Sequence, residues 1–165
     1  MKILVFSDSH CVLRFMRSCV EAVKPDAIIH LGDTVRDGDV IAQDHPAVRF
    51  FQVAGNCDRF RVAPDFPEIL VERFSGVKVF MTHGHLHGVK LYLDKLIAEG
   101  RKCGADVILY GHTHMADCRQ LEDGVWIMNP GSAGFDGGSA GIIRIGEDGT
   151  VSCNLIRQID LEGMQ

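Results

Sequence analysis

Apolar residues follow two patterns along the chain, and their alternation predicts the order of strands and helices. Short continuous apolar runs are typical of strands covered on both faces and occur at 3–6, 27–31 and 48–53. Between the first two runs, apolar residues recur every three or four positions from Leu13 to Val23, which predicts an amphipathic helix ending before Pro25. The first third is therefore predicted to be β-α-β, then an irregular connection with room for a short helix, then β. This order is typical of a mostly parallel sheet with helices packed on it.

The rest of the chain predicts a hairpin, one more helix and antiparallel strands. Segments 68–74 and 77–81 flank Ser75 and Gly76, a two-residue hairpin turn, and the spacing of apolar residues predicts a helix over 89–102. Further strands are expected at 106–110, 126–128, 140–145 and 151–156. Glu-Asp-Gly turns at 122–124 and 147–149 favour antiparallel pairing there. The prediction is one α/β domain over residues 1–165, with a mixed or doubled sheet.

Composition narrows the class of protein without naming a function. The formal net charge is −5 and the chain contains no basic run, which disfavours nucleic-acid binding. No apolar stretch reaches the ~18 residues of a membrane span, and the N-terminal apolar run is too short for a signal peptide. The six cysteines are scattered without a C-x-x-C pair, a pattern that favours free thiols in a reducing cytosol. We expect a soluble cytoplasmic domain, with the oligomeric state left open, a homo-oligomer included.

Five predicted strands are followed directly by side chains that can bind metal ions. Six of the eight histidines lie in three short motifs, which is unusual for residues that serve only solubility. Because ligands of open α/β sheets bind beyond the carboxyl ends of the strands, these segments are expected to converge on one crevice. The glycines before three of the ligands allow sharp turns and close approach of the backbone. The seven candidate metal ligands are Asp8, His10, Asp33, Asn56, His83, His112 and His114.

The donor types in this set indicate transition-metal chemistry. Nitrogen and oxygen donors without thiolates suit Mn, Fe, Co, Ni or Zn acting as Lewis acids. Seven donors exceed what one ion with an open position needs, but they fit two divalent ions. Asp33 is the natural candidate to bridge them at the roughly 3.5–4 Å used in two-metal hydrolysis.

The ordered motifs resemble the calcineurin-like metallophosphoesterase superfamily. They are Asp-x-His at 8–10, Gly-Asp at 32–33, Gly-Asn-x-Asp at 55–58, His-Gly-His at 83–85 and Gly-His-x-His at 111–114. The small size, Gly-Asn-Cys-Asp and Asn-Pro-Gly-Ser at 129–132 are most similar to its compact YfcE-type phosphodiesterase branch. The resemblance covers residues 1 to about 145. It implies a β-sandwich of two mixed sheets flanked by helices.

The resemblance also implies how the ligands are shared. One ion is expected on Asp8, His10, Asp33 and His114, and the second on Asp33, Asn56, His83 and His112. We expect manganese, with Fe, Ni, Co or Zn as other candidates.

The third motif departs from the pattern of most of the superfamily. Where those proteins have histidine, thought to assist the leaving group, this chain has Cys57. A thiol with a reference pKa near 8.5 is mostly protonated at neutral pH and can in principle donate a proton, but less effectively than imidazole. Packing or neutral lining is the alternative role for Cys57. By family likeness Asp58 orients a neighbour, and His85 is the best-placed spare imidazole for charge stabilisation or leaving-group protonation.

Charge and donor type together predict the reaction. Two divalent ions with Asp8 and Asp33 make a positive site on an acidic protein, so the substrate should be an anionic small molecule. The expected reaction is attack on phosphorus by a metal-bridging hydroxide, with a phosphodiester as the substrate, because leaving groups that need no protonation suffer least from the missing histidine.

Three other functions are kept beside this one. The first is a phosphomonoesterase or nucleotidase. The second is a non-catalytic protein-binding scaffold of the same fold, as in retromer-subunit relatives of the family. The third, a thiol hydrolase built on Cys57 and His83, would leave the other histidine motifs without a purpose.

The remaining polar residues are expected to have core, surface or packing roles outside the reaction. His30, inside an apolar strand, is expected to be a hydrogen-bonded core residue, and His87 a surface residue. The Gly-rich loop after Asn129 lacks the lysine of a phosphate-binding P-loop. Its resemblance to the family implies that it packs under the metal loops without touching substrate. Arg36, Arg59 and Arg61 could meet a phosphate, but an exposed face is favoured.

Overall fold

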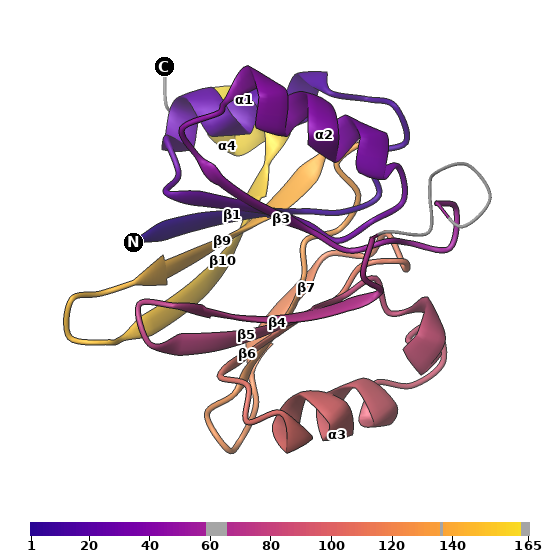
Figure 1. Ribbon diagram of the computed structural model, residues 1–165, viewed down its shortest axis with the longest axis vertical. Coiled ribbons are helices and arrows are strands. Elements are labelled where there is room, and N and C mark those ends of the chain that lie inside the picture. Colours follow the sequence, from indigo (N-terminus) through magenta and orange to yellow (C-terminus); the bar gives the residue numbers. More distant parts are fainter. Residues whose placement is uncertain (59–65, 136, 163–165) are drawn as a thin grey trace.

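Two five-stranded sheets pack face to face, with helices on both outer surfaces (Figure 1). The computed structural model describes residues 1–58, 66–135 and 137–162. The first sheet has the order β10-β9-β1-β2-β3, and these strands span Val151–Arg157, Ser139–Ile145, Lys2–Phe6, Ala27–His30 and Arg49–Gln52. The second has the order β4-β5-β6-β8-β7, and these strands span Ile69–Phe74, Val77–Thr82, Val107–Leu109, Trp126–Asn129 and Asp117–Gln120.

The helices complete a four-layer arrangement. α1 (Arg14–Val23), α2 (Val35–Asp44) and α4 (Gln158–Glu162) lie over the first sheet, and α3 (Asp94–Lys102) lies under the second (Figure 1). A short 3-10 helix, η1 (His85–His87), follows β5. Among the described residues, no helix is long and apolar enough to cross a bilayer.

The alternation of side chains along each strand explains the continuous apolar runs. In β1, Ile3 and Val5 face the layer between the sheets, whereas Leu4 and Phe6 pack against the outer helices. The same division holds in the second sheet, where Val79 joins the inner layer. Because successive side chains point to opposite faces, a strand buried on both faces must be apolar at every position.

The predicted β-sandwich of two mixed sheets flanked by helices is confirmed. β1, β2 and β3 are parallel, β9 pairs antiparallel with β1, and β10 pairs antiparallel with β9. The hairpin β4–β5 and the antiparallel pair β9–β10 form as predicted, and the predicted turn at 122–124 joins β8 to an antiparallel partner that was not predicted, β7.

Strand β7 and helix α4 were not predicted, and the start of helix α3 was predicted too early in the chain. β7 is polar and mostly half-buried or exposed, so it carries no apolar pattern. α4 is only one short turn at the C-terminal end of the described chain. The helix predicted over residues 89–102 begins later, at Asp94, which supplies the acidic residue of its first turn.

Candidate metal centre

All seven predicted ligands follow the carboxyl ends of five strands. β1, β2 and β3 run parallel in one sheet, and β5 and β6 run parallel in the other. The loops after these strands carry the seven candidate ligands, and the contacts described below join them. Both sheets therefore contribute donors to one crevice, as the position of the motifs predicts.

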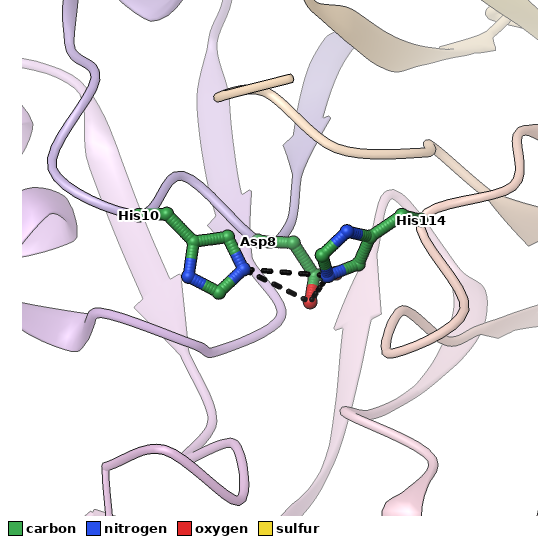
Figure 2. A group of neighbouring side chains, drawn as sticks. All are labelled: Asp8, His10 and His114. Carbon is green, nitrogen blue, oxygen red and sulfur yellow. Dashed lines mark hydrogen bonds and ion pairs between the residues drawn. The ribbon is translucent and has the colours of Figure 1, made fainter. Parts of the chain in front are cut away.

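The first group consists of Asp8, His10 and His114 (Figure 2). Nε2 of His114 lies 3.1 Å from Oδ1 of Asp8, and 3.3 Å from Nε2 of His10. Nε2 of His10 lies 4.0 Å from the same carboxylate oxygen. The three donor atoms thus surround a common point. Asp8 is fully buried whereas the two histidine side chains are 25% and 39% exposed, so this point is open to solvent on one side.

The second group is built around His83. Its Nδ1 lies 2.9 Å from the carbonyl oxygen of Leu31, an acceptor that fixes the proton on Nδ1. Nε2 of His83 therefore presents a lone pair, and it faces Oδ1 of Asn56 at 3.2 Å, Nδ1 of His112 at 3.2 Å and Oδ1 of Asp33 at 3.5 Å. Electron-pair donors this close together repel one another, and a bound cation removes that repulsion.

The two groups adjoin through Asp8. Its Oδ1 lies 4.0 Å from Nε2 of His83, a member of the second group. Oδ2 accepts hydrogen bonds from the Ser7 hydroxyl at 2.5 Å and from the His112 N–H at 3.1 Å. Oδ1, in contrast, is buried and has no hydrogen-bond donor within the described parts of the chain. A buried carboxylate oxygen without a donor is costly, so this atom fits a cation ligand.

The backbone at the ligands is unusual. Five of the seven have φ in the left-handed region, which non-glycine residues rarely adopt, and they are Asp8 (53°), His10 (45°), Asp33 (57°), His112 (68°) and His114 (60°). Such conformations cost about 1–3 kcal/mol each and occur where the surrounding structure enforces them, often at functional sites.

Glycines permit the close packing of these loops, as predicted. A Cβ on Gly55 would lie 2.2 Å from Oδ1 of Asp33, and one on Gly111 would lie 2.0 Å from the Ser7 hydroxyl oxygen. Both distances are too short for any side chain, so the loops can approach each other only with glycine at these positions.

Asp58 joins two ligand loops to the start of α2. Its buried carboxylate accepts four backbone hydrogen bonds of 2.8–3.0 Å, from the N–H groups of Asp33, Thr34, Val35 and Gly55. The first three belong to the turn that enters α2, where a negative charge is favourable. The geometry places Asp58 in contact with the backbone of Asp33, not among the ligand atoms.

Cys57 lies at the solvent-exposed edge of the second group. Its N–H donates to Oδ1 of Asp33 at 2.9 Å, and its sulfur accepts from Nδ2 of Asn56 at 3.4 Å. Partial burial, then the hydrogen bond and charge of Asp33, raise the pKa of the Cys57 thiol to about 11. The thiolate required by a thiol hydrolase is therefore disfavoured here.

His85 lies beside the second group. Its ring centroid is 5.5 Å from that of His83 and 6.1 Å from that of His112, and its Nε2 is 3.7 Å from Oε1 of Glu68. These distances put a further imidazole next to two ligand rings without placing it among the ligand atoms.

The charge state of the second group suits metal binding. Burial would raise the pKa of Asp33, but the electrostatic interaction with His83 and the hydrogen bonds from Cys57 outweigh it and hold that pKa below its usual range. Burial, followed by the nearby His83, lowers the pKa of His112 to about 4. An ionised carboxylate and a neutral imidazole are the forms that bind metal.

Sequence reasoning missed the residues that hold the ligand loops. Nδ2 of Asn129 donates to the carbonyl of Gly111 at 3.0 Å and to the hydroxyl of Thr113 at 2.9 Å, and the Ser132 hydroxyl donates to the carbonyl of Asp8 at 2.7 Å. Both are buried, Asn129 as the last residue of β8 and Ser132 in the loop after it, and a polar residue at the end of an apolar strand is the signal that could have pointed to them.

A buried hydrogen-bond chain fixes the Asp8–His10 loop. The Gly32 N–H donates to Nδ1 of His30 at 3.3 Å, so the ring proton resides on Nε2, 3.2 Å from the hydroxyl oxygen of Ser9. The Ser9 hydroxyl donates in turn to Oδ2 of Asp37 at 2.7 Å, and that oxygen also accepts from the Cys11 N–H. The expected core role of His30 is confirmed.

The surface role predicted for His87 is wrong. The residue is buried, its Nε2 lies 2.8 Å from Oε2 of Glu99, and its ring packs edge-on to Phe80. Burial follows from the turn of η1, which directs this side chain toward α3. Arg59 and Arg61 lie outside the described residues.

Comparisons with known proteins agree with this geometry. Residues 1–146 match the model of the calcineurin-like phosphoesterase superfamily domain. A probable metallophosphoesterase of Bacillus subtilis, YsnB, is 36% identical over 135 residues, or 80% of this chain and 75% of the relative. The phosphodiesterase YfcE of Escherichia coli is 28% identical over 162 residues, or 84% of this chain and 82% of the relative.

Solved structures share the fold. A Streptococcus pneumoniae protein described as a predicted phosphoesterase superposes with a TM-score of 0.76 at 25% identity, covering 96% of this chain and 90% of that one. Vps29 of Entamoeba histolytica complexed with Zn²⁺ gives a TM-score of 0.73 at 19% identity, covering 96% and 99%. The second likeness shows the fold alone.

Proposed function

This chain belongs to the calcineurin-like phosphoesterase superfamily, and from that premise we propose that it is a dinuclear metal-dependent phosphodiesterase. The observation that carries the proposal is that two groups of metal-binding side chains adjoin each other. In the first group, Oδ1 of Asp8 is buried without a hydrogen-bond donor among the described residues. In the second, the proton of His83 is held on Nδ1, so its Nε2 offers a lone pair to an ion. The name of the Escherichia coli relative, phosphodiesterase YfcE, supports a diester substrate.

The donor sets assign ligands to two sites. Asp8, His10 and His114 would hold one ion, and Asn56, His83 and His112 the other. Asp33 would serve both, because its carboxylate contacts His83 and also lies within electrostatic range of His10. When bound, divalent cations supply Lewis-acid polarisation of a phosphoryl oxygen and lower the pKa of a water molecule. Mn²⁺ suits this donor set and is the ion we propose.

The protein's own residues contribute position and charge. The ligand carboxylates and neutral imidazoles leave the loaded site with a net positive charge, which favours an anionic phosphoester on a protein of charge −5. His85, beside the rings of His83 and His112, is positioned to donate a hydrogen bond or proton to an oxygen of the substrate. Asp58 keeps Asp33 in place through its backbone.

Cys57 is the reason to favour diesters with good leaving groups. Its neutral thiol is a weak hydrogen-bond donor. A leaving group that departs as a stable anion needs no proton, so aryl phosphodiesters should be the best substrates.

Hydrolysis of bis(p-nitrophenyl) phosphate tests the proposal. Activity should disappear after chelator treatment, return with Mn²⁺, and exceed the activity on p-nitrophenyl phosphate. Asp33→Asn should lose about 10²-fold or more, whereas the exposed Asp123→Asn serves as a control with unchanged activity. Activity that survives the chelator would contradict the proposal. Retained metal without turnover of any phosphoester would instead favour a protein-binding scaffold.

A further inference from the structure

A cavity opens beside the first ligand group, and none of the roles described above uses it. Its volume is about 520 Å³, and its lining includes the ligand His114, the aromatic ring of Phe135 and the side chain of Arg157 at the end of β10. A volume of this size accommodates a small organic group. Because His114 belongs both to this lining and to the first ligand group, the cavity adjoins the site at which a phosphoryl group would bind.

Phe135 lines this cavity and also contacts both ligand histidines of the first group. Its ring stacks on the ring of His114, with centroids 5.4 Å apart and planes at 17°, and lies 5.1 Å from the ring of His10. The side chain is nevertheless 51% exposed, so part of the ring remains available to a ligand. An exposed aromatic face of this kind can stack on a planar group of a ligand.

The loop that carries Phe135 is fixed. The Ser132 hydroxyl accepts hydrogen bonds from the N–H groups of Gly134 and Phe135 while it donates to the carbonyl of Asp8. A Cβ on Gly134 would lie 2.2 Å from the carbonyl oxygen of Ser9, so glycine is required for this contact. The loop therefore packs under the metal loops, as predicted, but it also delivers an aromatic ring to the substrate side.

Arg157 supplies a positive charge to the lining of the cavity. The arginines Arg17, Arg101 and Arg119 are paired with nearby carboxylates, whereas the guanidinium of Arg157 has no ion pair among the described residues. On a protein of charge −5, an arginine left without a carboxylate partner in a cavity is available to an anionic ligand.

We propose that this cavity binds the ester group of the phosphodiester that is retained on phosphorus, and that it selects a planar aromatic group carrying a negative charge. The inference rests on the proposed function. The ring of the substrate would stack on Phe135, and its carboxylate or phosphate would pair with Arg157. Phe135 and Arg157 then determine specificity, while the metal ligands carry out the reaction.

Three substrates with the same p-nitrophenol leaving group test this. Methyl p-nitrophenyl phosphate has no second ring, phenyl p-nitrophenyl phosphate adds the ring, and 4-carboxyphenyl p-nitrophenyl phosphate adds the charge. In Mn²⁺-loaded wild-type protein, kcat/KM should rise at each step, by about three- to tenfold for stacking and about two- to fivefold for the exposed ion pair.

Each variant should abolish one of the two increases in kcat/KM along this series of substrates. Phe135→Ala should abolish the preference for phenyl over methyl, and Phe135→Tyr should keep it. Each preference is the ratio of two kcat/KM values measured on the same variant, so an effect of Phe135→Ala on metal binding cancels. Arg157→Gln should abolish the preference for the carboxylate over the unsubstituted phenyl ester. Met115→Ala, an exposed neighbour of His114 outside the lining, and Arg144→Gln, an exposed arginine on β9, are matched controls and should keep both preferences.

The outcomes separate this inference from the proposed function. Hydrolysis of the methyl ester with equal kcat/KM for all three substrates, or preferences that survive both Phe135→Ala and Arg157→Gln, would overturn the inference and leave the phosphodiesterase standing. A Mn²⁺-loaded wild-type protein that hydrolyses none of the three would overturn both.

Discussion

Side chains in the crevice have one of two roles. Some offer lone pairs to an ion, and others hold the loops that carry these ligands in place. Oδ1 of Asp8 and Nε2 of His83 belong to the first kind, because their other polar atoms are already committed to protein partners. Asp58 and Ser132 belong to the second, because their oxygen atoms bind backbone groups of the ligand loops. Substitution of a residue that offers a lone pair should cause loss of bound metal. Substitution of a residue that holds the ligand loops should lower the free energy of unfolding.

Cys57→Ala should leave most of the activity. Burial and the neighbouring Asp33 raise the pKa of its thiol to about 11 in the metal-free protein, which favours the neutral thiol, and a neutral thiol is a weak hydrogen-bond donor. Loss of a true general acid costs about 10²- to 10⁴-fold, whereas we expect a change below about threefold in kcat/KM for bis(p-nitrophenyl) phosphate. A loss of a hundredfold with normal metal content would show that Cys57 takes part in the reaction.

His30 should make the stability of the metal-free protein depend on pH. Burial lowers its pKa to about 4 in the folded state, against about 6.5 when unfolded. Between these values only the unfolded state binds the proton, so the free energy of unfolding is complete above pH 6.5 and falls, by about 3 kcal/mol in total, as the pH drops toward 4.

Urea unfolding in chelator at pH 7 and pH 4.5 measures this effect. His30→Gln should be less stable at pH 7 but should lose less stability on acidification than the wild type. Equal losses in the two proteins would mean that His30 does not contribute to the pH dependence.

At the scale of elements, the ends of parallel strands place the ligands and the loops between them are fastened to each other. β2 and β3 end side by side, and Asp58 bridges their loops and the first turn of α2 through four N–H groups. The loop after β8 fastens the loops after β6 and β1 in the same way.

Asp58→Asn should destabilise the fold and loosen the metal site together. One of the two acceptor oxygens becomes an NH₂ group that faces backbone donors, for an expected cost of about 3 kcal/mol. Urea unfolding without metal measures the cost, and metal content after dialysis measures the second effect. Asp148→Asn, in the exposed β9–β10 turn, is the matched control. An Asp58→Asn protein as stable as this control would refute the role of Asp58.

The sequence predicted elements and ligands where the signal is local. β1 and β2 were predictable because both of their faces are buried, and the ligands because they directly follow such strands. β7 was not, since an edge strand of polar composition has no apolar pattern. Asn129 and Ser132 could be recognised as turn residues, but their partners Gly111 and Asp8 lie 18 and 124 positions away, and such pairs become visible only in the folded chain.

At the scale of the whole molecule, the sandwich brings donors from two sheets to one crevice. Strands β1–β3 supply Asp8, His10, Asp33 and Asn56, while β5 and β6 supply the remaining histidines. The apolar layer between the sheets fixes their relative position, so the ligand geometry depends on the packing of the complete core. The arrangement of two donor groups, and not any one residue, is therefore the feature that supports the proposed function.

Metal content measured on purified protein loaded with Mn²⁺ tests that feature most directly. The account predicts about two ions per chain in the wild type and in Asp123→Asn, and well below one in Asp33→Asn, because the shared carboxylate is lost from both sites. One ion or none in the wild type, or two ions retained by Asp33→Asn, would contradict the dinuclear centre.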